Sequence, residues 1–558
     1  MKHTEPHLYP AASLFSSVSV NDWKENPAFR FFGKRLFTDQ SLPEFLNELL
    51  LILFSPKRLA QQPCSPIEGC FPSREVLNVP GGLRLEYAPS ARLNLKLFAF
   101  LGASRLDARH KTHREHFDEL QKKLRERLRA DSDADKSAIL RDLENLFLGL
   151  RSTGEGRTWC AQQFLPLCPH LLTAETIWNE KEAVRNPTVN WEDSFTTTSK
   201  YWSINRHRFM ARGGEVLYYQ LCLALSRKQD EIVRWNKDAA LGLGPEELDP
   251  EGLRLALEQA LAAMQPSYSG LDDLASFICE LEEETALSTD ADRDGEPRYQ
   301  AMGWCAADSW KEGYLFAIEL LHILRADVDI MERLALLETA CGLQILRTLL
   351  ARTAFLTKQA LPWPGYLIPV TASEGASFAL RSVSQHACKY LRTMQERLIL
   401  AQLPNCTYEP AGKSKGAYTD LEAAKKKFLG DEVSRKYAAG LFASLAKNYL
   451  GLIVPRTGSG ERFVLSERIL RLLVLTLVPA QKHLSLDTFK QRVRAWHGFV
   501  FDAEGIEEAQ RWLSGQAALF PARCDAWLHD MLEDGNFLIH LSDACSLVYN
   551  PIAESLEA

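Results

Sequence analysis

The spacing of apolar residues constrains the fold of this chain more than any other feature of its sequence. In most segments apolar side chains recur at i, i+3, i+4 and i+7, which is the spacing of one face of an α-helix. The segments with this spacing are 43–54, 115–130, 137–150, 252–264, 313–325, 330–356 and 380–401. Two short runs, 83–88 and 366–372, have the composition of strands, and they are too few for a large sheet. The sequence therefore predicts a mainly α protein.

The length of the chain requires several compact units. Its 558 residues exceed the ~250–300 residues at which single hydrophobic cores stop growing. Polar stretches rich in turn-forming residues, near 288–300 and 402–420, indicate joints between domains. The sequence has no repeat of fixed period, so it does not indicate a solenoid. We predict a mixed, mostly helical N-terminal domain at 1–135, a helical domain with a basic, glycine-containing loop at 136–295, a helical core domain at 296–410, and a tandem winged-helix-like domain at 411–558.

The C-terminal domain is predicted from a pattern that occurs twice. In the first copy, helical residues precede two β-prone runs, 450–455 and 462–466, which are separated by the turn-forming segment RTGSGE. In the second copy, Ser485 is a candidate N-cap of one helix, and a later helix ends at a Gly and precedes the runs 537–541 and 546–550. A helix that leads into a β-hairpin is the outline of a winged helix.

The two winged-helix-like units differ in charge. Residues 461–558 contain nine Lys or Arg and fourteen Asp or Glu, a net charge of −5, which opposes contact with phosphates and favours a protein adaptor. The first unit is more basic, and its candidate DNA contacts are Lys425, Lys426, Lys427 and Arg456. The alternative interpretation of the three lysines is a solvated helix face.

A second candidate site is the segment YWSINRHRFMARGGEVLYYQL at 201–221. The first turn of a helix has unpaired N–H groups and the positive end of the helix dipole, so glycines there admit an anion while arginines add bidentate donors. The residues of this candidate anion or nucleic-acid site are Arg206, His207, Arg208, Arg212, Gly213 and Gly214. The alternative is a structural loop in which Glu215 pairs with one of the arginines.

A third basic stretch runs from 105 to 129, with nine Lys or Arg against five Asp or Glu, a net charge of +4. The default interpretation is the charged outer face of a helix, and the alternative is a contact with phosphates.

The sequence predicts no catalytic residue, no metal centre and no cofactor. Cys160, Cys168 and His170 lack the paired short spacings of a structural zinc site. The segment 290–295 opens like a calcium-binding loop, but Ala301 stands where the bidentate Glu belongs. Phosphate-binding loops, nucleophile elbows and zinc-protease motifs are absent. A nuclease assembled from dispersed carboxylates remains an alternative, since such a site needs no local motif.

The remaining features indicate a cytoplasmic protein. The N-terminus lacks the uninterrupted apolar stretch of a secretory signal. The longest apolar runs, 45–54 and 469–478, are about half of the ~20 residues that span a bilayer, so we expect no membrane contact. The 12 cysteines are scattered, which suits a reducing compartment. The net charge of −7 excludes a surface that is basic all over, so any DNA contact must be a local patch.

The runs YLGLIVPRTGSGERFVLSERILRLLVLTLV and FLIHLSDACSLVYNP, within about the last 130 residues, resemble a known family. They are similar to non-catalytic accessory subunits encoded beside HerA/FtsK-type ATPases in bacterial anti-phage restriction islands, such as the G subunit of phosphorothioation-dependent DNA restriction systems. The resemblance implies a cytoplasmic bacterial protein in a DNA-directed defence complex whose partner hydrolyses ATP. It carries over no functional residue.

These observations together predict a non-catalytic, DNA-associated subunit that bridges DNA and an ATPase or nuclease partner. Two alternatives stay open. One is a protein-assembly scaffold without DNA contact, and the other is the metal-dependent nuclease.

Overall fold

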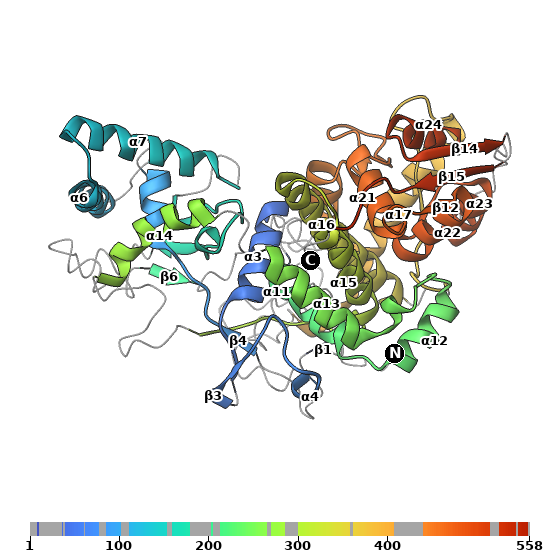
Figure 1. Cartoon of the computed structure of the whole chain (residues 1–558). Coiled ribbons are helices and arrows are strands. Elements are labelled where there is room, and N and C mark those ends of the chain that lie inside the picture. Colours follow the sequence, from blue (N-terminus) through green and yellow to red (C-terminus); the bar gives the residue numbers. More distant parts are fainter. Residues whose placement is uncertain are drawn as a thin grey trace.

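The computed structural model of the chain is mainly helical, as the apolar spacing predicts (Figure 1). The structure describes residues 8–9, 36, 40–60, 62–77, 85–101, 111–152, 159–178, 202–204, 213–264, 269–284, 299–357, 361–406, 439–513, 524–542 and 545–555. All statements below concern these residues.

Four helices form the centre of the molecule. They are α3 (Leu42–Phe54), α11 (Gly213–Leu225), α15 (Trp310–Arg325) and α16 (Ile330–Leu356). Helix α3 packs on α11 and α16, α15 packs on the same two helices, and α11 also contacts α16, so each helix of the set contacts at least two others. Helices that are far apart in sequence thus share one core.

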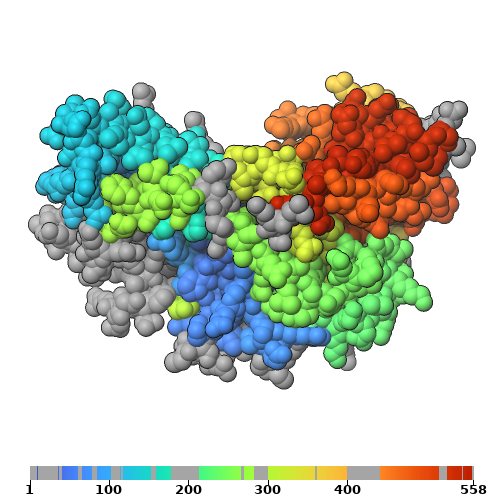
Figure 2. Space-filling model, in the orientation of Figure 1, coloured from blue at the N-terminus to red at the C-terminus, as the bar shows by residue number. Residues whose placement is uncertain are grey.

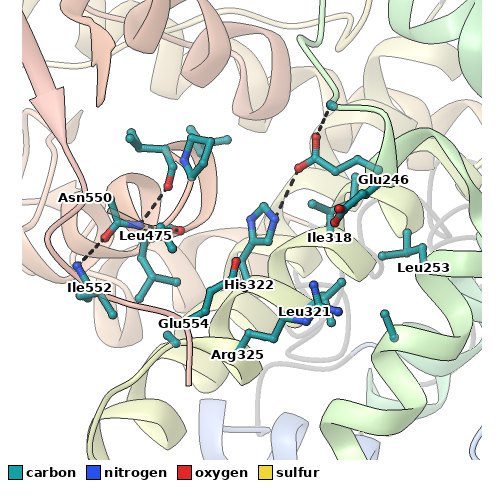
Figure 3. Close-up of a pocket in the computed structure, with 18 of the residues that line it drawn as sticks. Glu246, Leu253, Ile318, Leu321, His322, Arg325, Leu475, Asn550, Ile552 and Glu554 are labelled. Atoms are coloured by element: carbon teal, nitrogen blue, oxygen red, sulfur yellow. Dashed lines mark hydrogen bonds and ion pairs between the residues drawn. The ribbon is translucent and has the colours of Figure 1, made fainter. Parts of the chain in front are cut away.

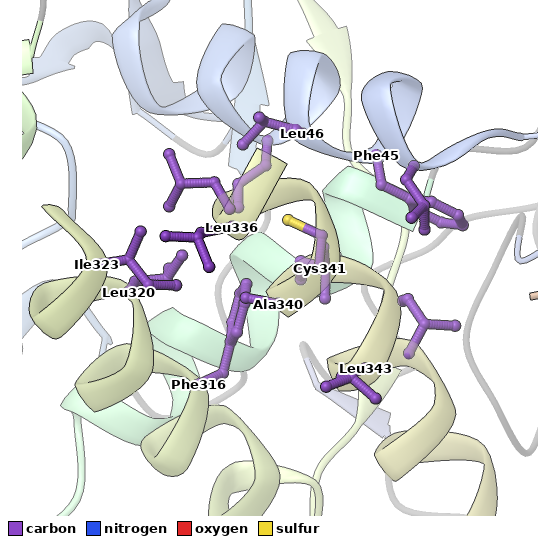
Figure 4. Close-up of a cluster of buried hydrophobic side chains, with 14 of the residues drawn as sticks. Phe45, Leu46, Phe316, Leu320, Ile323, Leu336, Ala340, Cys341 and Leu343 are labelled. Atoms are coloured by element: carbon purple, nitrogen blue, oxygen red, sulfur yellow. The ribbon is translucent and has the colours of Figure 1, made fainter. Parts of the chain in front are cut away.

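Apolar side chains from three of these helices meet in one cluster (Figure 4). Phe45 of α3, Phe316 and Leu320 of α15, and Leu336 and Cys341 of α16 are all buried. Helix α16 is buried on all sides over most of its length, as expected for a helix that is apolar around its circumference. Of the described helices, only α16 is long and apolar enough to cross a membrane, and 89% of its most apolar window is buried inside the protein. It is therefore a core helix.

Two lobes rise from this centre and leave a notch between them (Figure 2). One lobe is formed by α5 (Leu93–Lys96), the π-helix η2 (Leu97–Leu101), α6 (Lys111–Arg127), α7 (Asp133–Gly149), η3 (Trp159–Ala161), η4 (Pro169–Leu171) and α14 (Ser269–Glu284). Helices α6 and α7 pack on η2, and α14 packs on α5 and η4, which joins residues before and after α11 in a single lobe.

Short antiparallel strands flank the central helices. A four-stranded sheet has the order β3 (Gln62–Ile67), β2 (Lys57–Leu59), β4 (Leu85–Tyr87) and β7 (Gln300–Ala301). Two further pairs are β1 (Leu8–Tyr9) with β8 (Cys305–Ala306) and β5 (Thr176–Trp178) with β6 (Trp202–Ile204). Strand β4 confirms the strand predicted at 83–88.

Other helices cover the central set. They are α4 (Arg74–Leu77), α12 (Gln229–Ala239), η5 (Glu246–Leu248), α13 (Pro250–Met264) and α17 (Phe378–Cys406). Helix α13 packs on α15, and α17 packs on α16.

The second lobe contains both predicted β-hairpins. The first follows α20 (Ala439–Ser444) and the π-helix η6 (Leu445–Tyr449), and it pairs β10 (Ile453–Val454) with β11 (Arg462–Phe463). The rest of the lobe consists of α21 (Glu467–Leu477), β12 (His483–Ser485), α22 (Leu486–His497), β13 (Phe499–Val500), α23 (Ala503–Trp512), α24 (Ala526–Asp534), β14 (Leu538–Ser542) and β15 (Cys545–Tyr549). Ser485 caps α22 by accepting a hydrogen bond from the Thr488 amide, as predicted.

Two sheets complete this lobe. Strands β12, β15 and β14 form an antiparallel sheet in that order, so β14 is an edge strand. Strand β13 pairs in parallel with β9 (Ile368–Pro369), within the second predicted strand run. One hydrophobic cluster runs through the whole molecule, from Leu36 to Val548, and includes residues of all four predicted domains.

Candidate functional site

The N-terminus of α11, which the sequence marks as an anion site, is bonded to α3 and its N-terminal flank. The Gly213 amide donates to Gln40 Oε1 at 2.8 Å and the Gly214 amide donates to Glu48 Oε2 at 2.9 Å. Gln40 Nε2 also donates to Glu48 Oε2 at 3.0 Å. The buried Glu48 carboxylate thus occupies the place where a helix dipole favours an anion. A carboxylate of the chain itself engages the N–H groups that a phosphate would use.

The two glycines also permit the close packing of α11 on α3. A Cβ at Gly213 would overlap the ring of Phe45, and a Cβ at Gly214 would lie 2.7 Å from the backbone N of Leu49. Real Cβ atoms essentially never approach a non-bonded heavy atom this closely. The glycine pair is therefore required where the two helices cross.

The other predicted contacts divide into two groups. The described residues do not include Arg206, His207, Arg208, Arg212, Lys425, Lys426 and Lys427, so their contact with DNA stays a prediction. Arg456 is exposed in the loop between β10 and β11. Its side chain makes no hydrogen bond or ion pair with any described residue, which leaves the guanidinium available.

A cavity of about 780 Å³ lies between the central helices and the C-terminal lobe (Figure 3). Helices α13 and α15 form one side, and the end of α21 and residues 550–554 form the other. The strand-like bridge between Ala326 and Glu554 closes one edge. Leu253, Ile318 and Leu475 give the cavity an apolar surface.

His322 is the central polar group of this cavity (Figure 3). Its Nδ1 lies 2.8 Å from the carbonyl oxygen of Thr476, and its Nε2 lies 3.4 Å from Glu247 Oε1. Both ring nitrogens therefore have partners. None of the lining residues carries a hydroxyl, thiol or amine, so the described lining lacks the usual side chains of covalent catalysis. The arrangement can hold an apolar ligand, and it offers no nucleophile beyond carboxylates and this histidine.

A buried cluster of charged groups around Glu319 joins the central helices to the C-terminal lobe. Arg347 on α16 donates from Nη1 and Nη2 to the two oxygens of Glu319 on α15, at 2.9 and 2.8 Å. His497 Nε2, at the end of α22, lies 3.2 Å from Glu319 Oε1. Arg347 also donates to Gln344, which donates to Gln220 of α11. The cluster ties α11, α15, α16 and α22 together.

The pKa values of this cluster follow from burial and from the neighbouring charges. Burial acts to raise the pKa of Glu319, but Arg347 and His497 outweigh it and lower the pKa to about 2. Burial lowers the pKa of His497 in spite of the nearby carboxylate. Glu312 lies about two turns before Glu319 on α15. Burial raises its pKa to about 7. Glu319 is therefore ionised at neutral pH, and Glu312 is half protonated there.

Further chemistry is sparse in the described part of the chain. No group of three or more His, Cys, Asp or Glu there is arranged to hold a metal ion. The ten cysteines whose side chains the structure describes are free thiols. His170, which the sequence places near Cys160 and Cys168, has its Nδ1 2.9 Å from Oδ1 of Asp272.

Sequence reasoning missed the cavity and the buried ion pair. The cavity combines segments that are distant in sequence, and Glu319 and Arg347 of the ion pair are 28 residues apart. Neither has a local spacing that marks it. The one available signal was a charged residue on an otherwise apolar helix face, as at Glu319 and Arg347.

Comparisons with known proteins assign this chain to no family. A scan against protein-family models, a search of curated proteins and a search of solved structures each find no match.

Proposed function

We propose that this chain is a non-catalytic subunit of a multi-component complex, and that its C-terminal lobe binds a partner protein. This proposal rests on the surface formed by α24 and β14, which has acidic and apolar side chains and contains no Lys or Arg. We call it the α24–β14 surface.

The order of elements from α21 to β15 supports a winged-helix interpretation of this lobe. A helix and a strand come first, further helices follow, and a hairpin comes last, with its second strand between the other two strands of the sheet. In DNA-binding helix-turn-helix proteins the later helix enters the major groove. The corresponding helix here is α24.

Helix α24 is poorly suited to DNA. Its exposed side chains include Asp530, Glu533 and Asp534, and residues 526–549 contain no Lys or Arg. DNA affinity comes largely from neutralised phosphates, so this helix would repel a duplex. The charge favours a partner protein with a basic contact surface.

Strand β14 supplies the apolar part of the surface. It is the edge of its sheet, and Ile539 and Leu541 are 40% and 60% exposed. Edge strands without charged residues or proline are open to pairing with another chain, and β14 has neither. A partner strand added at this edge would bury both side chains and gain backbone hydrogen bonds.

A second function, DNA contact, is favoured by two other features. Arg456 is exposed in its hairpin loop, and α6 exposes Arg114, Lys122 and Arg125 at the surface of the first lobe. A chain that bound DNA with these residues and a protein with the α24–β14 surface would act as a bridge. The setting in a bacterial anti-phage complex with a HerA/FtsK-type ATPase rests on the family resemblance alone. The proposed cytoplasmic location rests also on the scattered cysteines and the N-terminal sequence.

The test compares two surface variants of the full chain. The tagged protein is purified from its host after nuclease treatment, and its stoichiometric partners are identified by mass spectrometry. We expect an equimolar partner with wild type and with R456Q, and its loss with the double variant I539K/L541K. Retention of that partner by I539K/L541K would contradict the proposal.

DNA contact is tested separately, by fluorescence anisotropy of a labelled duplex across a salt series with and without Mg²⁺ or Mn²⁺. R456Q is expected to weaken binding about equally for different DNA sequences and to flatten the salt dependence, as loss of a phosphate contact does. Metal-dependent cleavage of the duplex would instead identify the chain as a nuclease.

A further inference from the structure

Three tryptophans from separate segments line a hollow in the surface beside α12, the helix labelled at the lower right of Figure 1. Trp235 lies on α12, Trp310 begins α15, and Trp363 belongs to the segment that follows α16. Trp235 stands edge-on to Trp310 at 69° and to Trp363 at 85°, with ring centroids 5.1 and 5.5 Å apart. The rings therefore form walls at steep angles to one another, which we call the tryptophan cage.

A cation of the chain itself lies over all three rings. Lys311 Nζ is 6.0 Å from the ring centroid of Trp235, 5.8 Å from that of Trp310 and 5.7 Å from that of Trp363. It makes no hydrogen bond or ion pair with any described residue. Aromatic rings attract cations within about 6 Å of the centroid, and cages of this type recognise quaternary ammonium groups.

The cage opens into space that a larger ligand can use. The hollow over the rings has a volume of about 480 Å³, and Glu231 and Asp238 also line it. A second hollow of about 330 Å³ adjoins it and shares Asp238, Pro362 and Trp363 with it. An ammonium head in the cage would thus have room for its attached chain, beside carboxylates of opposite charge.

The lining charge is consistent with a cationic guest. With Lys311 in place, two cations (Arg234, Lys311) balance two anions (Glu231, Asp238) along the first hollow. When the Lys311 ammonium swings out, Arg234 remains beside the two carboxylates. Glu231 also pairs with Arg227 at 3.7 Å, so Asp238 is the carboxylate available to a cationic guest. The lysine is half-buried and has four rotatable bonds, so its displacement needs no movement of the backbone.

We propose that the tryptophan cage is a binding site for an alkylated ammonium group, and that Lys311 occupies it when no ligand is bound. The ligand competes with the lysine for the same three rings. The shared chemistry is a methylated ammonium on an extended chain, either a free quaternary amine or a methylated lysine of a peptide.

The test uses the full chain and tetramethylammonium as the probe, measured by isothermal titration calorimetry. K311S empties the cage, so we expect saturable binding to K311S and binding about tenfold weaker to wild type, which is the order of magnitude of one desolvated cation–π interaction. Absence of saturable binding to folded K311S overturns the proposal.

Two matched double variants assign the location. K311S/W363L removes one wall and is expected to lose binding, whereas K311S/W512L changes a tryptophan outside the cage and is expected to keep it. Equal affinities of these two variants overturn the assignment. If K311S does not fold, the comparison of W363L with W512L at tenfold higher probe concentration decides the same question.

Choline and its uncharged analogue 3,3-dimethylbutan-1-ol test the need for charge. Equal binding of the two would overturn the proposal, since only choline is a cation. A peptide with trimethyl-lysine, compared with choline, distinguishes the sources: tighter binding of the peptide supports a protein ligand, and tighter binding of choline supports a small molecule.

Discussion

Removal of the guanidinium from the buried pair of Glu319 and Arg347 tests how much this pair stabilises the packing of α15 on α16. Both side chains are almost fully buried, at 2% and 1% exposure, and two hydrogen bonds join them. R347M leaves the carboxylate buried without its main partner. Breaking a buried pair in this way costs ~3–5 kcal/mol, and we expect that loss in the free energy of unfolding, measured by urea denaturation at pH 7.

Two further variants separate the buried charge from packing. E319L/R347M removes both charges, and replacement of a buried pair by apolar residues is often close to neutral, so we expect it to recover at least half of the loss. R392M breaks a pair with Glu461 that is partly exposed, where ~0–1 kcal/mol is expected. A loss below ~1 kcal/mol for R347M, or a larger loss for the double variant than for R347M, would refute the reasoning.

The pH dependence of R347M gives an independent check. In the wild type the pKa of Glu319 is lowered to about 2, so its contribution to stability is complete above the ordinary value of ~4.3 and is lost as the pH falls toward 2. Without Arg347, the largest of the charges that lower the pKa of Glu319 is gone, so burial raises that pKa relative to the wild type. The stability deficit of R347M should therefore shrink as the pH falls below neutral and the carboxyl takes up a proton.

Three other variants test single features of the structure. G214A places a methyl group 2.7 Å from atoms of α3 and should cost ~1–3 kcal/mol, seen as a lower Tm, while G270A, with open space around it, should leave Tm nearly unchanged. Burial raises the pKa of Glu312 to about 7, so the folded wild type holds an extra proton and should lose stability as the pH rises from about 4.5 to 7. E312Q should abolish this loss, and an unchanged profile of stability against pH would count against the reasoning. S485A removes the α22 cap and should cost ~1 kcal/mol by urea denaturation.

The helices and hairpins were predictable because their determinants are local. The apolar spacing of α15 and α16 fixes their ends within three residues, Ser485 marks the start of α22, and the glycine-rich turn marks the β10–β11 hairpin. Each of these signals acts within a few residues of the chain, so one sequence suffices to read it.

The role of the glycine pair at the start of α11 could not be predicted, because it depends on tertiary contacts that the sequence does not show. Gly213 and Gly214 after four basic or imidazole side chains fit an anion site, and the same pair fits a close crossing of two helices. The partner that distinguishes these cases is Glu48, 166 residues earlier in the chain. The tryptophan cage has the same origin, since Trp235, Trp310 and Trp363 are brought together only by tertiary packing.

The pairing of α15 with the end of the chain affects how the protein folds during synthesis. The Asp327 amide donates to the carbonyl of Ala553, and the Ser555 amide donates to the carbonyl of Arg325. Domains generally fold from the N-terminus as the ribosome delivers the chain, but this wall of the cavity is completed only after residue 555 has left the exit tunnel. Until then the Asp327 amide and the Arg325 carbonyl lack these partners, and a nascent chain at that stage offers both groups to water or to a chaperone.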